Sequence, residues 1–397
     1  MPFRTQVGYC AGLMNNGHYR PFASLDRGIT VFPIFPTARL RPSPFYNSTI
    51  EAGMVSVSIY NRMIVPTSYG DPEAEYWRLV NGVSMWDMGV ERQVQLKGPD
   101  ALKLAQILTP RDLSICAEGQ GKYAPICNHD GVLLNDPIIL KFSDELLWLS
   151  IADSDIWNWA RAISAERGLK VTISEPDVSP LAVQGPKAEQ VVSELIGDWV
   201  KDLKYFWFRE ASLNGIPLVV QRSGWSKQGG FELYLKDGTR GKELWDLVAE
   251  AGKPYDIGPG AATTAERVES GLVSVGGDTD DNTNPFEVRL GRYVNLDVPD
   301  DVVGIKALRA EHERGIKRHQ LGVILDGDSP DPMGFQWEPI TVNGDRVGSM
   351  TICVFSPRIK RNIGYALVDR AVNPGTKVQV HRPGGPVAGV VQELPFL

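Results

Sequence analysis

Cysteine and histidine are scarce in this sequence, which has four Cys and five His among 397 residues. The cysteines form no CxxC pair, so neither a disulfide framework nor a zinc ribbon is predicted. The histidines are far apart, and none belongs to an HExxH motif. Metal catalysis and a Ser-His-Asp triad therefore lack the side chains that they require, and we predict no metal site.

Long apolar segments and a surplus of positive charge are also missing. No apolar run reaches the roughly 18 residues of a membrane-spanning helix, and the N-terminal MPFRTQVGYCAGLMNNGHYR does not resemble a secretory signal. The 48 Asp and Glu outnumber the 41 Lys and Arg, which gives a net charge of −7. Phosphate binding needs excess Lys and Arg. We therefore expect a cytoplasmic protein whose partners include neither nucleic acid nor a membrane.

The sequence pattern divides the chain into four parts. Residues 1–50 are rich in Pro, Gly and Arg and predict an arm over the body. Residues 51–300 contain strands and amphipathic helices, the first of them a helix predicted over residues 72–87, PEAEYWRLVNGVSMWD. Residues 301–316 predict a charged linker helix, and residues 317–397 show short, evenly spaced strands that are typical of a small β-barrel.

A strand followed by a glycine turn and a helix occurs twice in the central region. QLKGPDA (residues 95–101) and AVQGPKA (residues 182–188) each end a strand and lead into an apolar-periodic helix. The two segments are similar enough to be equivalent halves of a duplicated unit. The predicted fold class is therefore α+β, with a duplicated α+β unit and a C-terminal barrel.

Two carboxylates stand inside otherwise apolar strands. Asp136 interrupts GVLLNDPIIL, and Glu232 lies between Phe231 and Leu233 in GGFELYL. Burying a carboxylate costs several kcal/mol unless it is paired or takes part in function. From the residues alone, Asp136 is either a turn residue or a site residue, and Glu232 is either a solvated strand residue or a site residue.

The segments around these carboxylates carry a family resemblance. ICNHDGVLLNDPIIL resembles the GGVxDD strand of the folate-binding T-protein family of glycine cleavage, and RSGWSKQGGFELYL resembles its RTGYTGExGFE segment. Similar segments follow in the family's order, among them AERVESGL, NPFEVRLG and FSPRIKRNIGYALVD, so that the resemblance covers roughly residues 62–397. Within the family, VERQVQLKGPDA, LNDPIILK and RSGWSKQGGFE most resemble the tetrahydrofolate-dependent dimethylsulfoniopropionate demethylases.

Three features depart from that subgroup. Residues 261–264 read AATT where CPN is expected, and residues 274–278 read SVGGD where an aromatic residue and Asn are expected. The chain also has an N-terminal extension of about thirty residues. These departures leave the fold and the use of folate as expectations, but they leave open which methyl donor is used.

The resemblance implies a three-domain, cloverleaf-like fold around a central folate channel, with tetrahydrofolate as the methyl acceptor. It implies that Glu232 binds the pterin, whose adjacent amino group and ring N–H suit one carboxylate. It also implies that Asp136 is catalytic and lies near the reacting nitrogen N5. The remaining cofactor contacts are expected from Tyr123, Ser150, Gln184, Trp225 and Arg358, the last at the glutamate tail. The alternative for Arg358 is a solvated basic turn.

A sulfonium donor would leave as a neutral thioether, which needs no general acid, so in-line alignment with N5 supplies much of the rate. Its recognition needs aromatic faces for the cation and a basic side chain for the carboxylate. The candidates for these roles are Trp86, Trp225, Phe206 and Tyr234 for the cation and Arg92, beside Glu91, for the carboxylate. The alternatives are core packing for the aromatic residues and a structural ion pair between Glu91 and Arg92.

Other functions remain open at this stage. The same machinery could demethylate a betaine or a methoxylated aromatic acid, or the chain could bind folate without transferring a methyl group. A glycine-cleavage aminomethyltransferase is disfavoured, because the TGE of that elbow has become Ser226-Lys227-Gln228. The oligomeric state, with a homodimer among the options, also stays open.

Overall fold

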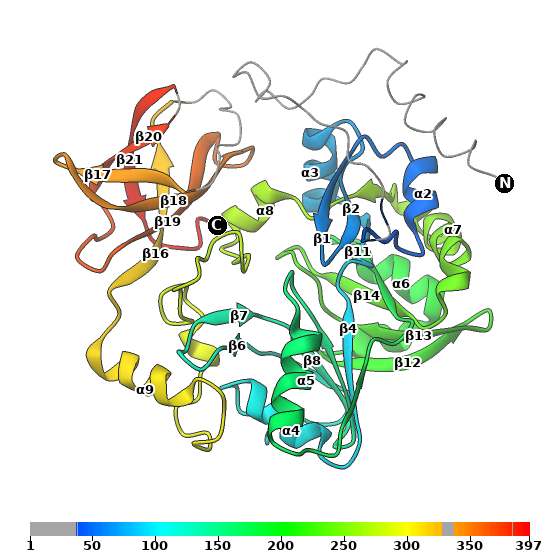
Figure 1. Cartoon of the computed structure of the whole chain (residues 1–397). Helices are drawn as coiled ribbons and strands as arrows, with labels where there is room; N and C mark the ends of the chain where they lie inside the picture. Colours follow the sequence, from blue (N-terminus) through cyan, green and yellow to red (C-terminus); the bar gives the residue numbers. More distant parts are fainter. Residues whose placement is uncertain (1–36, 38, 328–336, 383) are drawn as a thin grey trace.

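The computed structural model describes residues 37, 39–327, 337–382 and 384–397, so most of the expected N-terminal arm, residues 1–36 and 38, lies outside the described residues. Two sheet-containing lobes and a barrel surround a common centre (Figure 1). This α+β architecture is the one that the family resemblance predicted. Within the described ranges, no helix combines the length and the apolar character needed to cross a membrane.

The first lobe is built on five strands, namely β4 (Gln93–Lys97), β5 (Gln120–Tyr123), β8 (Ile138–Ser143), β9 (Leu146–Ser150) and β10 (Thr172–Ser174). They form an antiparallel sheet in the order β10-β4-β9-β8-β5. Helices α4 (Ala101–Leu108) and α5 (Ile156–Glu166) bury their apolar faces in one core with β4 and β9. The short strands β6 (Ile126–Cys127) and β7 (Leu133–Asn135) form a separate ladder beside this sheet.

The second lobe is built on six strands, namely β3 (Ser84–Asp87), β11 (Ser179–Gln184), β12 (Phe208–Leu213), β13 (Ile216–Gln221), β14 (Gly230–Leu235) and β15 (Gly258–Gly260). Their order is β12-β13-β14-β11-β3-β15, and only the β3–β15 pair is parallel. Helices α6 (Ala188–Ile196) and α7 (Gly241–Gly252) share a core with this sheet.

The helix predicted over residues 72–87 is shorter in the structure, where α3 spans Pro72–Asn81. Asp71 caps its first turn by accepting a hydrogen bond of 2.9 Å from the backbone N–H of Ala74, and Gly82 follows its last residue. The next residues form β3, which is buried along its whole length between β11 and β15. The prediction failed there because β3 has only four residues and all of them are buried, the polar Ser84 and Asp87 included, so it shows no alternation that would distinguish a strand from the end of a helix.

The repeated strand–glycine–helix segments have the same backbone geometry in both lobes. β4 leads into α4 through Gly98, which has φ = +139°, and β11 leads into α6 through Gly185, which has φ = +122°. A Cβ atom at either position would lie 2.5 Å from a backbone carbonyl oxygen, that of Lys170 or that of Gly82. Glycine avoids both the strained φ and the close contact. The duplication inferred from the sequence is thus visible as one turn used twice.

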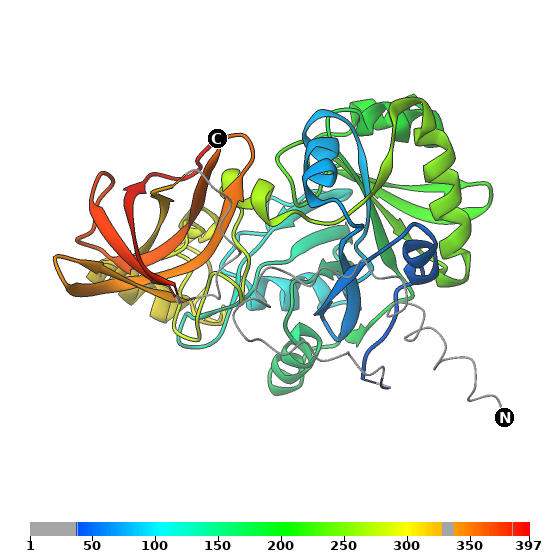
Figure 2. The ribbon, with the colours of Figure 1, turned by 90° about the horizontal axis from the view of Figure 1, so that it is seen from above.

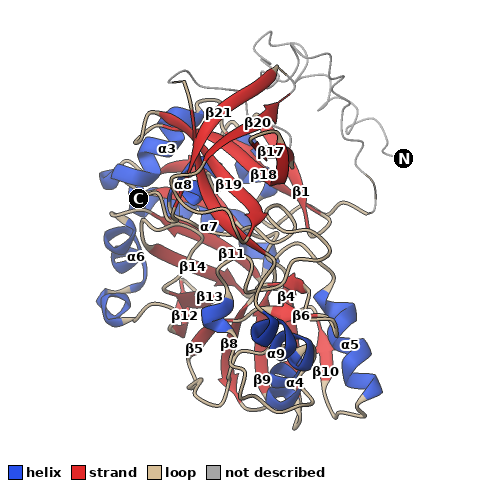
Figure 3. Ribbon diagram, turned by 90° about the vertical axis from the view of Figure 1, so that its left-hand side faces the viewer, coloured by secondary structure: helices blue, strands red, loops and turns tan. Residues whose placement is uncertain are grey.

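The C-terminal strands are β16 (Arg318–Leu325), β17 (Glu338–Val342), β18 (Asp345–Ser356), β19 (Arg361–Asp369), β20 (Lys377–Arg382) and β21 (Gly385–Gln392). They close into the predicted barrel in the order β16-β19-β18-β17-β20-β21. Helix α9 (Ile305–Arg314) precedes the barrel. Figure 2 shows the barrel to one side of the two lobes, and Figure 3 shows the molecule from the side of the barrel.

The remaining described elements are α2 (Tyr46–Glu51), the hairpin β1 (Ser56–Tyr60)–β2 (Met63–Ser68), α8 (Thr264–Glu269), and the 3-10 helices η2 (Asp198–Asp202), η3 (Gly238–Arg240), η4 (Lys253–Tyr255) and η5 (Gly291–Tyr293). Between α8 and α9 the chain follows an irregular path that is tied to the barrel. Arg318 of β16 forms ion pairs with Asp280, at 2.7 Å, and with Glu287, at 3.1 Å. These ion pairs fix the irregular segment to the barrel, and a hydrogen bond of 2.9 Å from the backbone N–H of Leu133 to the carbonyl of Thr283 fixes it to β7 beside the first lobe.

Candidate active site

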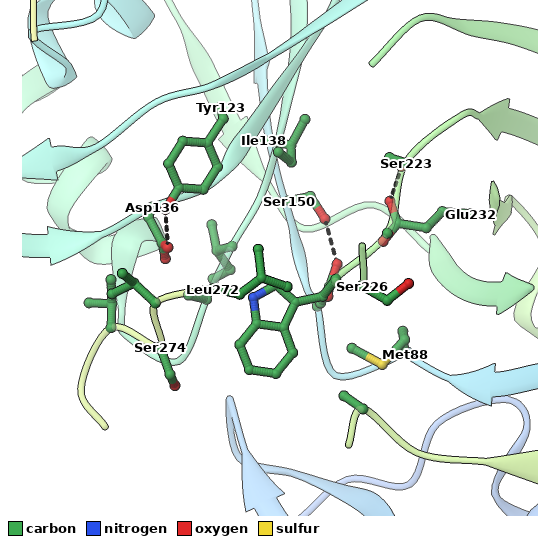
Figure 4. Close-up of a pocket in the computed structure, with 18 of the residues that line it drawn as sticks. Met88, Tyr123, Asp136, Ile138, Ser150, Ser223, Ser226, Glu232, Leu272 and Ser274 are labelled. Atoms are coloured by element: carbon green, nitrogen blue, oxygen red, sulfur yellow. Dashed lines mark hydrogen bonds between the residues drawn. The ribbon is translucent and has the colours of Figure 1, made fainter. Parts of the chain in front are cut away.

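A cavity of about 390 Å³ lies where the two lobes meet the segment before the barrel. Its wall comes from the β1–β2 hairpin, the β3–β4 connection, strands β5, β8 and β9, the elbow between β13 and β14, and residues 271–293. Figure 4 shows Asp136 and Glu232 on opposite sides of it. The residues predicted from the sequence that line this cavity are Glu91, Tyr123, Asp136, Ser150, Phe206, Trp225 and Glu232.

Glu232 lies in β14 and is buried. Its Oε2 atom accepts a hydrogen bond from the hydroxyl of Ser223 and lies 2.9 Å from the hydroxyl of Tyr234. Burial raises the pKa of the Glu232 carboxyl, and both hydroxyls oppose that rise because they stabilise the ionised form. Its Oε1 atom accepts no hydrogen bond from the described residues, so this oxygen keeps its capacity for a ligand.

Asp136 lies in the gap between β7 and β8, where Pro137 interrupts the pairing. The hydroxyl of Tyr123 donates a hydrogen bond of 2.6 Å to its Oδ2 atom. Burial raises the pKa of Asp136 to about 7, although the bond from Tyr123 acts in the opposite direction. A carboxylate with this pKa exchanges its proton near neutrality, which suits a general base.

Asn135 fixes the backbone that carries Asp136, a role that the sequence did not reveal. Its amide nitrogen donates to the carbonyl oxygen of Ala152, at 2.9 Å, and to the hydroxyl of Ser154, at 2.7 Å. Its side-chain oxygen accepts from the backbone N–H groups of Asp136 and Ala152, both at 3.0 Å. The strand break therefore holds Asp136 in one position.

A third carboxylate, that of Glu91, also lines the cavity. The hydroxyl of Ser150 donates to its Oε2 atom at 3.3 Å. Burial, and then the nearby charge of Glu232, raise the pKa of Glu91 well above its ordinary value. Among the described residues, no basic side chain forms an ion pair with Glu91, Asp136 or Glu232, so the acidic character of this wall is not neutralised internally.

Trp86, Gln184 and Tyr234 do not line the cavity, although each was predicted to contact a ligand. Trp86 is buried, and its indole N–H donates to the hydroxyl of Ser84 at 2.9 Å. Gln184 is fully buried and holds the elbow between β13 and β14 through the carbonyl of Ser223 and the hydroxyl of Ser226, both at 2.9 Å. These three residues stand behind the wall, where Gln184 and Tyr234 support residues that form it.

Arg92 and Arg358 also lie outside the cavity. The guanidinium of Arg92 is held by Glu175, with Nε 2.8 Å from Oε1, while the neighbouring Glu91 turns inward to Ser150. The predicted alternative, a Glu91–Arg92 ion pair, is therefore not formed. Arg358 instead donates to Glu269 at the junction between the barrel and α8, with Nε 2.9 Å from Oε2.

Several residues that line the cavity were not predicted from the sequence, chiefly Tyr60, Lys227, Arg289, Arg292 and Tyr293. The ring of Tyr293 lies 4.7 Å from that of Tyr123, and so borders the Asp136 side. A signal existed in NPFEVRLG, which resembles a family segment, but nothing in it singled out one side chain. Among the residues that the structure describes, no group of three or more His, Cys, Asp or Glu side chains is placed to hold a metal ion.

Comparison with known proteins agrees with this architecture. The fold is that of an aminomethyltransferase: the crystal structure of the glycine cleavage system aminomethyltransferase T from Bartonella henselae superposes with a TM-score of 0.79, at 22% identity, over 90% of this chain and 98% of that one. The GCVT N-terminal domain family matches residues 45–298, and the glycine cleavage T-protein C-terminal barrel domain family matches residues 318–397. The chain belongs to the glycine cleavage T-protein family.

Two relatives are similar along nearly their whole lengths. The dimethylsulfoniopropionate demethylase DmdA of Ruegeria pomeroyi is 38% identical over 89% of this chain and 96% of its own length. An aminomethyltransferase of Thermotoga maritima is 29% identical over 90% of this chain and 98% of its own length. These matches confirm the predicted family, and with it an enzyme of the tetrahydrofolate-dependent methyltransferase class.

Proposed function

We propose that this protein transfers a methyl group from dimethylsulfoniopropionate to N5 of tetrahydrofolate, giving methylthiopropionate, 5-methyltetrahydrofolate and a proton. The observation that carries the proposal is the 38% identity to the Ruegeria pomeroyi demethylase along almost the whole of both chains. The cavity supports it, because its wall carries two carboxylates on opposite sides, Glu232 and Asp136, which a folate ring lying between them could contact at its two ends (Figure 4).

Glu232 is proposed to anchor the pterin. Its Oε1 atom has no donor among the described residues, whereas Oε2 is already approached by the hydroxyls of Ser223 and Tyr234. These hydroxyls favour the ionised carboxylate, which is the form that accepts two N–H donors side by side. A pterin bound there enters a site in which the acceptor is already oriented.

Asp136 is proposed to act on the proton of N5. As N5 attacks the methyl carbon, a bond forms between them, the S–C bond breaks, and the nitrogen becomes positively charged. An ionised Asp136 stabilises that charge and can take the proton, directly or through water. The hydroxyl of Tyr123 holds the carboxylate in place for this step, and the side-chain oxygen of Asn135 holds the backbone N–H of Asp136.

The chain supplies the environment that a sulfonium donor needs. The thioether leaves without a proton, so a wall without histidine among the described residues is no obstacle. Phe206 and Trp225 line the cavity and offer aromatic faces to the cation, each worth about 0.5–2 kcal/mol. Glu91 lines the same wall, and a cationic donor beside it would favour its ionised form.

A betaine or a methoxylated aromatic acid remains the second candidate for the donor. Both segments that depart from the demethylase pattern, residues 261–264 and 274–278, contribute to the wall through Ala262, Ser274 and Val275. The proposed cytoplasmic setting is supported by three buried cysteines without disulfides, Cys116, Cys127 and Cys353, which suit a reducing compartment. The proposed reaction needs only the two small molecules, and it can run in a monomer or a homodimer.

The test is an anaerobic assay with purified protein, tetrahydrofolate and dimethylsulfoniopropionate, with 5-methyltetrahydrofolate quantified by chromatography. Glycine betaine and a methoxybenzoate serve as parallel donors, and Asp136→Ala serves as the inactive control. Product from the sulfonium alone, lost in the control, is the expected result. Turnover on another donor only would move the proposal to that donor, and folate binding without turnover on any donor would refute it.

A further inference from the structure

We propose that Arg289 binds the carboxylate of the methyl donor and thereby selects zwitterionic substrates. This inference rests on the proposed function, because it assumes a donor with a methylated cation at one end and a carboxylate at the other. Arg92, the residue expected to do this from the sequence, lies outside the cavity and is held by Glu175. The donor carboxylate therefore needs a different basic partner.

Three basic side chains line the cavity, namely Lys227, Arg289 and Arg292. Lys227 and Arg292 are exposed, whereas Arg289 is partly buried. Among the described residues none of the three is ion-paired. This distinguishes Arg289 from Arg267, a buried arginine nearby whose charge is neutralised by Asp278 at 2.7 Å.

The hydrogen bonds of Arg289 leave both its charge and one of its nitrogens available. Nε donates to the side-chain oxygen of Gln320 at 3.1 Å, and Nη2 donates to the backbone carbonyl of Gly271 at 2.7 Å. Both acceptors are neutral, and Nη1 has no acceptor within the described part of the chain. A partly buried guanidinium without a counter-ion is costly unless a ligand supplies the charge.

The backbone at Arg289 is also strained. Its φ of +64° is a left-handed conformation, which costs a non-glycine residue on the order of 1 kcal/mol and is found preferentially at functional sites. The flanking residues Val288 and Leu290 line the cavity as well. The turn therefore delivers the guanidinium to the cavity while its neighbours pack against the same wall.

The position of Arg289 suits the donor better than the folate. Arg292 and Tyr293 follow Arg289 closely in the chain and line the same wall. The ring of Tyr293 packs 4.7 Å from that of Tyr123. Tyr123 in turn holds Asp136, so this wall borders the Asp136 side of the cavity, opposite Glu232 (Figure 4). With the pterin anchored at Glu232, the donor approaches N5 from the Asp136 side.

A carboxylate bound by Arg289 would fix the donor at the end remote from its methyl group. A charge-assisted, two-pronged bond sets direction as well as affinity, and it holds the cationic end toward Asp136. The site then has a separate partner for each charge of the donor. Donors without a carboxylate would lose this anchor and bind poorly.

The test compares Arg289→Gln, Arg289→Lys and wild type with two donors, dimethylsulfoniopropionate and its amide, which keeps the sulfonium but lacks the carboxylate. Arg92→Gln is the matched control, because Arg92 lies outside the cavity. Arg289→Gln should raise KM for dimethylsulfoniopropionate about 10- to 100-fold while KM for the amide and for tetrahydrofolate change by no more than about twofold. Arg289→Lys keeps the positive charge but lacks the two-pronged guanidinium, so its KM for dimethylsulfoniopropionate should lie between those of wild type and Arg289→Gln.

Equal losses on both donors, or an unchanged KM for dimethylsulfoniopropionate, would overturn the inference. Thermal unfolding identifies a variant that fails to fold, and Arg289→Lys then provides the comparison. Calorimetric titration with dimethylsulfoniopropionate separates this inference from the proposed function. Wild type that binds the donor without turnover, with binding lost in Arg289→Gln, supports the anchor and refutes demethylation. Wild type that neither binds nor demethylates it overturns both.

Discussion

The two lobes repeat one strand–glycine–helix architecture but hold their carboxylates in different ways. In the second lobe Glu232 sits inside the regular strand β14, with two hydroxyls at one of its oxygens. In the first lobe Asp136 sits in a break between two strands, with the single hydroxyl of Tyr123. Burial raises the pKa of both carboxyls, and for Asp136 it does so to about 7.

This difference indicates how a duplicated unit can divide the work between its copies. A carboxylate inside a strand has neighbours set by the sheet register, which suits fixed recognition of a ligand. A carboxylate at a strand break is less constrained by the ladder and can be placed where charge changes during a reaction. We therefore expect the carboxylate of the second lobe to bind the folate and that of the first lobe to take part in the reaction. Variants of the two should then lose different kinetic constants.

The largest effect is expected from Asp136→Asn. Asparagine keeps the shape and can still accept the bond from Tyr123, but it cannot take a proton or carry a negative charge. We expect kcat to fall by about 100- to 10,000-fold while KM for tetrahydrofolate stays nearly unchanged. Steady-state kinetics measures both constants, and a large rise in KM with normal kcat would show that Asp136 binds rather than reacts.

The next largest effect is expected from Glu232→Gln, which should change KM for tetrahydrofolate and leave kcat nearly unchanged. Its loss removes a charged acceptor from the proposed pterin site, so KM for tetrahydrofolate should rise about 10- to 150-fold. Glu210→Gln is a matched control in the same sheet, because Glu210 is exposed on β12 and pairs with Lys236. Direct titration with folate checks the affinity, and a variant that binds as tightly as wild type would remove Glu232 from the site.

The sequence predicted most of the fold because the relevant signals are local. Gly98 and Gly185 mark the duplicated turn, and the alternating strands after residue 317 predict the barrel. The C-terminal end of the helix predicted over residues 72–87 was wrong because the residues of β3 are placed by contacts with distant strands. β3 is an interior strand of only four residues, and its polar Ser84 and Asp87 are buried together with Met85 and Trp86, so its sequence does not alternate as that of a half-buried strand does.

The candidate site could be predicted where it depends on motifs, but not where it depends on side-chain direction. Glu91 and Arg92 lie in the turn that leads into β4, where their side chains diverge, so Glu91 faces the cavity while Arg92 faces Glu175. Arg289 escaped prediction because its segment is irregular. That segment is positioned by ion pairs from Arg318, a contact that no short window of sequence contains.

A smaller effect, specific to Asp136 of the first lobe, is expected on the pH dependence of stability. The pKa of Asp136, about 7, exceeds the value of about 3.9 for an unfolded Asp. The native state therefore holds this proton more tightly, and the resulting stability is complete below about pH 4 and lost as the pH rises through about 7. We compare the Tm of Asp136→Asn with that of wild type at two pH values. The difference, variant minus wild type, should be on the order of 5 °C larger at pH 8 than at pH 5.

Scanning calorimetry at the two pH values measures this difference, and an equal gain at both would show that Asp136 titrates normally. The same pKa predicts that kcat/KM of the wild type rises with pH through about 7, as the carboxylate becomes available to accept a proton. A flat profile across that range would argue against Asp136 as the base, whatever the effect of its substitution on the rate.

The last comparison asks whether the strand–glycine–helix turns of the two lobes respond alike to substitution, and its effects are expected to be the smallest. Gly98→Ala and Gly185→Ala should each lower the free energy of unfolding by about 2 kcal/mol or more, because each adds a Cβ 2.5 Å from a carbonyl oxygen at positive φ. Gly215→Ala is the control, since its φ is +79° but no atom lies within 4 Å of its Cβ position. The control should lose only about 1 kcal/mol. Thermal unfolding of the three variants would contradict the equivalence if one lobe tolerated the alanine and the other did not.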